Sequence, residues 1–200
     1  MADYSWPNFP ISRFVMRVQP LGKTFSSPYS NQTQAIDMMG DCWVAEMDFT
    51  PGRGVVAGSA IEAFFDRLKG AANRIILSNL RVTKNAGTMS GAPVLTTLAA
   101  QLTNTLAITT TVGATIAVGD MLGCGAQLFR ALTSGVADGS GHISVEVAPR
   151  VRAAGGIAAG TVVTVTTPTA PFLLTSANPA LTWLPGGEYT APSISLRESF

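Results

Sequence analysis

The chain of 200 residues is long enough for one or two domains with a buried core, and 46% of its residues are hydrophobic. Charged residues make up 12%, about half the usual share, which fits either a surface partly covered by other subunits or a β-protein with Thr-rich exposed strands. The formal net charge of +1 gives no electrostatic reason to expect nucleic acid. No run approaches the roughly 18 apolar residues of a membrane helix, so membrane insertion is not expected.

The first part of the chain is typical of strands. Residues 1–10 show no secretion pattern, and their prolines and aromatic residues predict an extended segment with apolar anchors. Ile11–Gln19 alternates apolar and polar residues, which predicts a strand with one face in water. Residues 20–23 are predicted to turn the chain, and a second strand is predicted over 32–38. The alternation over 43–49 is the clearest strand pattern in the sequence.

A single amphipathic helix is predicted over residues 57–69. One side of it is apolar, and this side consists of Ile61, Phe64, Phe65 and Leu68. Lys69 in the last turn suits the helix dipole, and Gly70 can adopt the left-handed cap conformation. A lone helix with two adjacent phenylalanines must bury that side, so we expect it to cover a sheet. A further strand is predicted over Arg74–Ser78.

The composition changes near Gly87, where a Thr-rich and glycine-punctuated block begins. Between Gly91 and Ala170 the one aromatic residue is Phe129. Short strands are predicted over 106–110, 115–118, 127–132, 143–147 and 161–166. About five short strands separated by turns indicate a small barrel or sandwich. The strands over 127–132 and 143–147 are predicted to pair as a hairpin through the glycine-rich loop 138–141.

Aromatic residues return after Pro168 and Pro171, and residues 193–198 alternate again in a strand pattern. We therefore predict that the C-terminal segment rejoins the first domain. The predicted architecture is mainly β. A β-sandwich-like domain with one covering helix (residues 1–90 and 171–200) is interrupted by an inserted small β-barrel domain (residues 91–170).

The glycine motifs of the chain do not predict nucleotide binding. Gly22-Lys23-Thr24 resembles the end of a P-loop, but the required upstream glycine is replaced by Arg17. Gly123 and Gly125 begin a GxG pattern, yet Leu128 stands where a third glycine would be needed. We therefore interpret both as turns and expect no bound cofactor.

Candidate catalytic and metal-binding groups are few. His142 is the one histidine, and it lies at the predicted hairpin, away from a nucleophile in sequence. The loop 138–141 lacks the spaced carboxylates of a calcium loop. Asp41, Glu46 and Asp48 could supply a carboxylate pair for glycoside hydrolysis, but a solvated strand face explains Glu46 and Asp48 better.

Cys42 and Cys124 are expected to be buried free thiols rather than a disulfide, as in a reducing cytoplasm. One histidine and two distant cysteines also make a His/Cys metal site improbable. We predict no catalytic, metal or cofactor residues and no enzymatic activity.

The order of elements resembles a family, the small tail-tip proteins of long-tailed (siphovirus-type) bacteriophages, and in particular the distal tail protein. The residues that carry this resemblance in the first domain are Trp6-Pro7-Asn8-Phe9-Pro10, Phe25-Ser26-Ser27-Pro28, Gln32-Thr33, Trp43 and Ala63-Phe64-Phe65-Asp66-Arg67-Leu68-Lys69-Gly70. Those in the middle block are Val118-Gly119-Asp120, Asp138-Gly139-Ser140-Gly141 and Val147-Ala148-Pro149-Arg150-Val151-Arg152. The motifs are short and structural, and by analogy with this family the middle block is expected to be an OB-like barrel (an OB-fold).

The resemblance implies a structural virion protein of the phage tail, assembled in the host cytoplasm as a homohexameric ring. In this family the first domain forms the ring around the tail lumen, and the inserted domain projects outward. The implied partners are further copies of the chain, the tail tube protein and the hub proteins of the tail tip or baseplate. The segment around Trp6 and Phe9 and the edge strands are expected to form contacts. The alternative is a module of a tail or accessory protein that binds carbohydrate on the host surface through its middle barrel.

Overall fold

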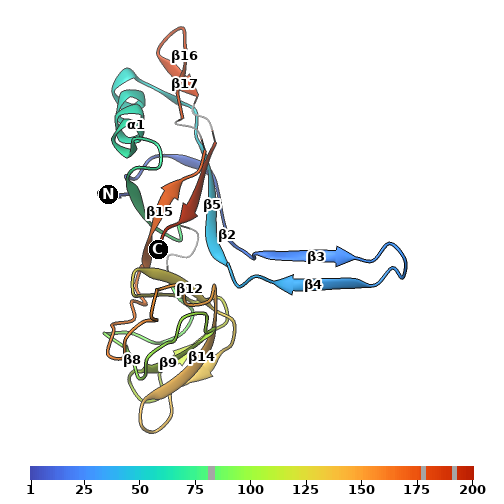
Figure 1. The fold of residues 1–200 in the computed structure, drawn as a ribbon. Coiled ribbons are helices and arrows are strands. Elements are labelled where there is room, and N and C mark those ends of the chain that lie inside the picture. The colour runs from blue at the N-terminus through green and yellow to red at the C-terminus, as the bar shows by residue number, and fades with distance from the viewer. Residues whose placement is uncertain (81–83, 177–178, 191–192) are drawn as a thin grey trace.

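The computed structural model describes residues 1–80, 84–176, 179–190 and 193–200. Within those ranges the fold is mainly β with a single helix, α1 (Val55–Leu68), as the sequence predicts (Figure 1). No helix in those ranges is long and apolar enough to cross a membrane. The strands are β1 (Asp3–Ser5), β2 (Ile11–Gln19), β3 (Gly22–Ser26), β4 (Thr33–Asp37), β5 (Cys42–Phe49), β6 (Gly52–Arg53), β7 (Arg74–Ser78), β8 (Val94–Leu95), β9 (Thr105–Thr109), β10 (Thr115–Ile116), β11 (Met121–Cys124), β12 (Gln127–Ala131), β13 (Gly135–Val136), β14 (His142–Ala148), β15 (Thr169–Leu174), β16 (Thr182–Leu184), β17 (Glu188–Thr190) and β18 (Ile194–Glu198).

A six-stranded sheet contains both ends of the chain, in the order β1-β7-β15-β18-β5-β2. β15 pairs with β7 on one side and with β18 on the other, and β18 pairs with β5. β15 and β18, which come from the C-terminal segment, thus occupy the middle of the sheet rather than its edge. The N-terminal strand β1 pairs in parallel with β7 at one edge, which ties down a segment predicted only as extended.

Helix α1 covers one face of this sheet. From Trp43 onward every second residue of β5 is buried, and this set, Trp43, Ala45, Met47 and Phe49, is the one that the alternation predicts. The N-terminal segment packs into the same layer, since the Trp6 ring lies 5.8 Å from the Phe64 ring and 6.1 Å from the Phe49 ring between centroids. Aromatic pairs at such distances stabilise the fold by more than the burial of their surface alone.

The ends of the helix differ slightly from the prediction. Lys69 lies outside the helix as its left-handed C-cap (φ 50°), and Gly70 also has positive φ (67°). At the other end Gly58 is buried, because the ring of Trp183 from the β16–β17 hairpin packs where a Cβ would stand. The indole nitrogen of Trp183 donates to Glu62 Oε1 at 3.1 Å, so this hairpin is held against the helix.

The Thr-rich block folds into a curled five-stranded sheet, ordered β11-β12-β14-β9-β8 (Figure 1). The strand predicted over 161–166 is not a continuous strand. It forms isolated bridges, Val162 to Val94 of β8 and Thr164 to Gly123 of β11. Because β8 and β11 are the two edges of the sheet, these bridges connect its edges, and we call the resulting unit the barrel.

The hairpin predicted between residues 127–132 and 143–147 is only partly formed. β12 and β14 share the pairs Arg130 with Ala148 and Ala131 with Val147, whereas β14 pairs along most of its length with β9. The connection between them is long enough for β13 to leave and pair with β10. Local turn signals could not reveal that the distant strand β9 is the better partner.

The buried hydrophobic residues form two clusters. One lies inside the barrel and runs in sequence from Met89 to Val165. The other lies between the six-stranded sheet and the helix, and it contains Phe64, Phe65 and Ile194. Met121 and Leu128 belong to the second cluster although their strands are barrel strands, so the two cores meet there.

The first turns of the barrel depend on a buried carboxylate. Asp120 is 4% exposed and accepts hydrogen bonds from the backbone nitrogens of Ala86 (2.7 Å), Gly87 (3.0 Å) and Ala117 (2.9 Å). A Cβ at Gly87 would overlap the carbonyl oxygen of Thr115 and lie 2.7 Å from Asp120 Oδ2. The close approach of backbone to backbone therefore requires glycine here.

Gly87→Ala is expected to lower the free energy of unfolding by about 1–3 kcal/mol, because the backbone of Thr115 cannot move aside as a flexible side chain could. Gly139→Ala is the matched control, since no atom lies within 4 Å of its Cβ position. The control should be neutral or stabilise by up to about 1 kcal/mol. Urea denaturation followed by circular dichroism measures both, and equal stability of the two variants would contradict the requirement.

Candidate assembly interface

The candidate residues that the sequence analysis considered and set aside do not come together. His142 is exposed at the start of β14, and its Nδ1 lies 3.1 Å from Thr109 Oγ1 on β9. Asp138 accepts hydrogen bonds from the backbone nitrogens of His142 (2.9 Å) and Ser140 (2.8 Å), and these lower the pKa of its carboxyl group. The carboxylate is thus used inside its own turn, as the interpretation of 138–141 as a turn implies.

The predicted carboxylate pair lies on the face of the sheet opposite the helix. Glu46 pairs with Arg17 at 3.0 Å, and Asp48 pairs with Arg13 at 3.4 Å, both across the β2–β5 ladder. Asp41 lies elsewhere, 3.5 Å from Arg150. Each carboxylate therefore has a cationic neighbour, and the three do not face one another across a cleft.

The glycine motifs and cysteines are structural in the described residues. Gly22-Lys23-Thr24 lies in β3 rather than in a phosphate-binding loop, and Gly125 (φ 59°) and Ala126 (φ 61°) form the tight β11–β12 turn. Both cysteines are free and buried, as predicted, and burial raises the pKa of Cys124 to about 11. No group of three or more His, Cys, Asp or Glu side chains able to hold a metal occurs in the part of the chain that the structure describes.

The feature that stands out instead is a hairpin that leaves the body of the molecule. β3 and β4 pair only with each other, and Figure 1 shows them pointing away from both cores. Every residue from Gln19 to Met39 is exposed except the half-buried Ser27. We call β3, β4 and the loop between them the projecting arm. Sequence reasoning missed it, because residues 20–23 were interpreted as a turn and β3 was not predicted.

The two faces of the projecting arm differ. Cross-strand partners share a face, so the pairs Lys23–Ile36 and Phe25–Gln34 lie together. Phe25 is 54% exposed and Ile36 is 47% exposed. The opposite face carries small or polar residues, namely Gly22, Thr24, Ser26, Thr33, Ala35 and Asp37. At the tip Tyr29 is 98% exposed.

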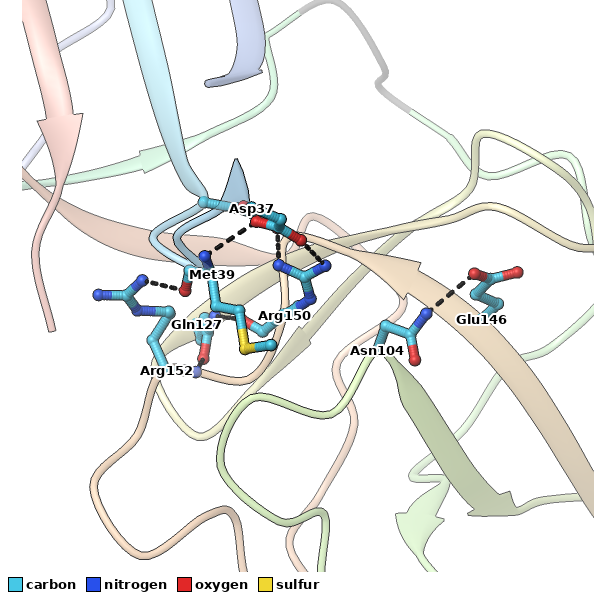
Figure 2. A network of polar contacts seen from close by, with 8 residues as sticks. Asp37, Met39, Asn104, Gln127, Glu146, Arg150 and Arg152 are labelled. Atoms are coloured by element: carbon cyan, nitrogen blue, oxygen red, sulfur yellow. Dashed lines mark hydrogen bonds and ion pairs between the residues drawn. The ribbon is translucent and has the colours of Figure 1, made fainter. Parts of the chain in front are cut away.

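The root of the projecting arm is fixed to the barrel by charge (Figure 2). Arg150, which follows β14, pairs with Asp37 at the end of β4 and lies 3.5 Å from Asp41. Arg152 donates to the Met39 carbonyl oxygen at 2.9 Å. The hydrogen bond from Arg150 lowers the pKa of Asp37, so this contact weakens when acid protonates the carboxyl group.

Gln127 of the barrel holds these two arginines in place. Its Nε2 donates to the Arg150 carbonyl oxygen at 2.7 Å, and its Oε1 accepts from the Arg152 backbone nitrogen at 2.9 Å. Between the root and the barrel lies an open cleft of about 430 Å³ that includes the exposed apolar residues Leu21, Met38, Met39 and Leu102. The arm direction is therefore set by the barrel as well as by the sheet.

A second polar contact joins the barrel to the sheet. Both backbone groups of Leu128 on β12 bind side chains of the other unit: its carbonyl oxygen accepts from Trp43 Nε1 at 2.7 Å, and its nitrogen donates to Glu198 Oε1 at 3.0 Å. Glu198 Oε2 in turn accepts from the Trp43 backbone nitrogen at 3.2 Å. We call these three residues the joint.

Glu198 is 4% exposed, and burial raises its pKa to about 7, although the two backbone hydrogen bonds act in the opposite direction. The sequence contained a signal for this residue, because the alternation that buries Ile194 and Leu196 places Glu198 on the same inward face. A charged residue in an inward register at a strand end indicates a specific polar contact.

Neither a scan of protein-family models nor a search of curated proteins finds a match for this chain. What the projecting arm and the joint do is therefore inferred from their chemistry and geometry.

Trp43→Phe is expected to lower the free energy of unfolding by at least about 2 kcal/mol, because the buried Leu128 carbonyl loses its donor and a space is left. Trp183→Phe is the matched control, since the same donor is lost at a 37% exposed side chain. The control should change stability by less than about 1 kcal/mol. Denaturation followed by circular dichroism measures both, and a joint that contributes little would give similar values.

Proposed function

We propose that this chain is a structural subunit of the tail of a long-tailed bacteriophage. Copies associate head to tail into a closed ring, of the distal tail type, that joins the tail tube to the tip or baseplate. The observation that supports this best is the projecting arm, whose strands pair only with each other among the described residues and whose apolar face is exposed.

The arm needs a surface outside its own chain. A two-stranded hairpin with no further packing is marginally stable in water, and an exposed apolar face of this kind is typical of an interaction site. Phe25 and Ile36 share that face as diagonal neighbours on the two strands, with Lys23 as its single charge. Burying them against another copy would desolvate little charge and would stabilise both the arm and the contact.

The arm is consistent with a head-to-tail contact. It extends from one side of the molecule, so a copy that offers its arm presents a different surface from the one that receives it (Figure 1). Contacts between two different surfaces generate rings when the rotation closes. The ring size of six, the tail tube and hub partners, and the virion location come from the resemblance to distal tail proteins. Nucleic acid and membranes are not among the proposed partners.

The alternative, a carbohydrate-binding module, gains no support from the barrel. Sugar sites use exposed aromatic rings, and Phe129, the one aromatic residue between 91 and 170, is fully buried. An enzyme is likewise not proposed, because the candidate acids and the histidine lie apart and make structural contacts.

The ring is tested by measuring mass in solution for the full chain and for a double variant, Phe25→Ser with Ile36→Ser. Wild type is expected to form oligomers at high concentration by light scattering after size exclusion, with rings visible in negative stain. The double variant should remain monomeric, because it removes the apolar face of the arm. Its melting temperature as a monomer should match wild type, since neither side chain is buried in the single chain.

The matched control is Thr24→Ser with Ala35→Ser, a pair on the same two strands but on the opposite face. It should assemble as wild type does. A wild-type protein that stays monomeric at every concentration would overturn the proposal. Equal assembly of both double variants would show that the apolar face of the arm is not the contact surface.

A further inference from the structure

The joint is a closed set of three hydrogen bonds, two of which run between the two units. Leu128 of the barrel is held at its carbonyl oxygen by the Trp43 indole (2.7 Å) and at its nitrogen by Glu198 (3.0 Å). Glu198 also accepts from the Trp43 backbone nitrogen (3.2 Å), which closes the set. Because one carboxyl group accepts on both oxygens, it links a sheet strand and a barrel strand at once.

We propose that Glu198 is a proton-operated latch. With a neutral carboxyl group the barrel stays seated on the six-stranded sheet, and with an ionised carboxylate the joint opens more readily to water. The proposal concerns a single chain and does not depend on the ring.

Burial of Glu198 outweighs the compensation for a negative charge that its surroundings supply, which comes first from the backbone nitrogens of Leu128 and Trp43. Trp43, at 0% exposure, covers it from β5, and its pairing partner on β15 is the buried Phe172. The charge of Arg152, from the segment after β14, acts in favour of the carboxylate, but less than burial acts against it. A carboxylate buried in such a place has a higher free energy than the same carboxylate in water.

The other charged groups around the joint have contacts of their own. Arg130 of β12 lies over the Trp43 ring, 4.8 Å from its centroid. Arg197, the neighbour of Glu198 on β18, donates to Cys42 Sγ of β5 at 3.1 Å. Arg152 itself also contacts the Phe200 ring (5.4 Å) and the Met39 carbonyl oxygen.

The direction of the effect follows from the two protonation states. In the closed joint the pKa of Glu198 is about 7, against an ordinary value of 4.5 that it would regain in water. Opening therefore releases a proton between these two values, and the opening constant rises with pH across that window. Above about pH 7 both states are ionised, so the rise levels off.

Opening would be transmitted to the projecting arm. Arg152 contacts Met39 at the arm root, and Arg150 pairs with Asp37 at the end of β4. Both arginines belong to the barrel segment that Gln127 holds, next to Leu128. A barrel that leaves the sheet would therefore release or redirect the arm.

Hydrogen exchange by NMR on the full chain tests the latch. The amide protons of Trp43 and Leu128 both bond to Glu198, so their protection reports opening directly. After correction for intrinsic exchange, their opening constant should rise roughly thirtyfold from about pH 5.5 to about pH 8.5. The amides of Val145 in the barrel and Ala45 in the sheet lie inside ladders and should not follow, which separates local opening from unfolding.

Glu198→Gln removes the titration and also one of the two accepting oxygens, so protection at the joint should be lower at every pH and should lose this pH dependence. Glu46→Gln is the matched control on the neighbouring strand β5, where the carboxylate is partly exposed and paired with Arg17, and it should keep the wild-type profile. A pH-independent opening constant in wild type would overturn the latch, as would an unchanged profile in Glu198→Gln. If the glutamine variant does not fold, the pH dependence of the opening constant in the wild type is by itself the test of the latch.

Discussion

The structure depends on the seating of the barrel strand β12 against the six-stranded sheet. Leu128 offers its side chain to the core of the sheet unit and both of its backbone groups to Trp43 and Glu198. An inserted unit joined by two chain crossings could otherwise swing freely. Buried polar contacts are directional where apolar packing is not, so they specify one relative orientation.

That orientation gives the projecting arm its direction. The arm grows out of the two strands β2 and β5 of the sheet, yet its root is bound by Arg150 and Arg152 of the barrel. A hairpin that buries none of its own residues keeps a fixed direction only if its base is held from more than one side. Sheet, barrel and arm thus form one connected framework, in which an apolar face is displayed at a defined place.

Several sequence patterns predicted the structure well, and the failures have physical causes. The alternation over 43–49 and the strand Arg74–Ser78 were right because burial on one face imposes a period of two. The helix was right to within two residues at its start because its apolar side meets a core. β3 was not predicted, because it buries neither face and so shows no apolar alternation. The strand predicted over 161–166 was wrong, because this segment bridges the two edges of the barrel sheet instead of forming a ladder.

The mainly β class, the single amphipathic helix and the buried free cysteines could be predicted without coordinates, because these follow from local periodicity and composition. The sequence also indicated the change of composition that accompanies the barrel. Three sets of contacts became visible only in the folded chain: β14 pairs with β9, Glu198 bonds to Trp43 and Leu128, and Arg150 pairs with Asp37. Those contacts join residues far apart in the chain, and their partners are selected by the geometry of the folded sheets, which no local pattern encodes.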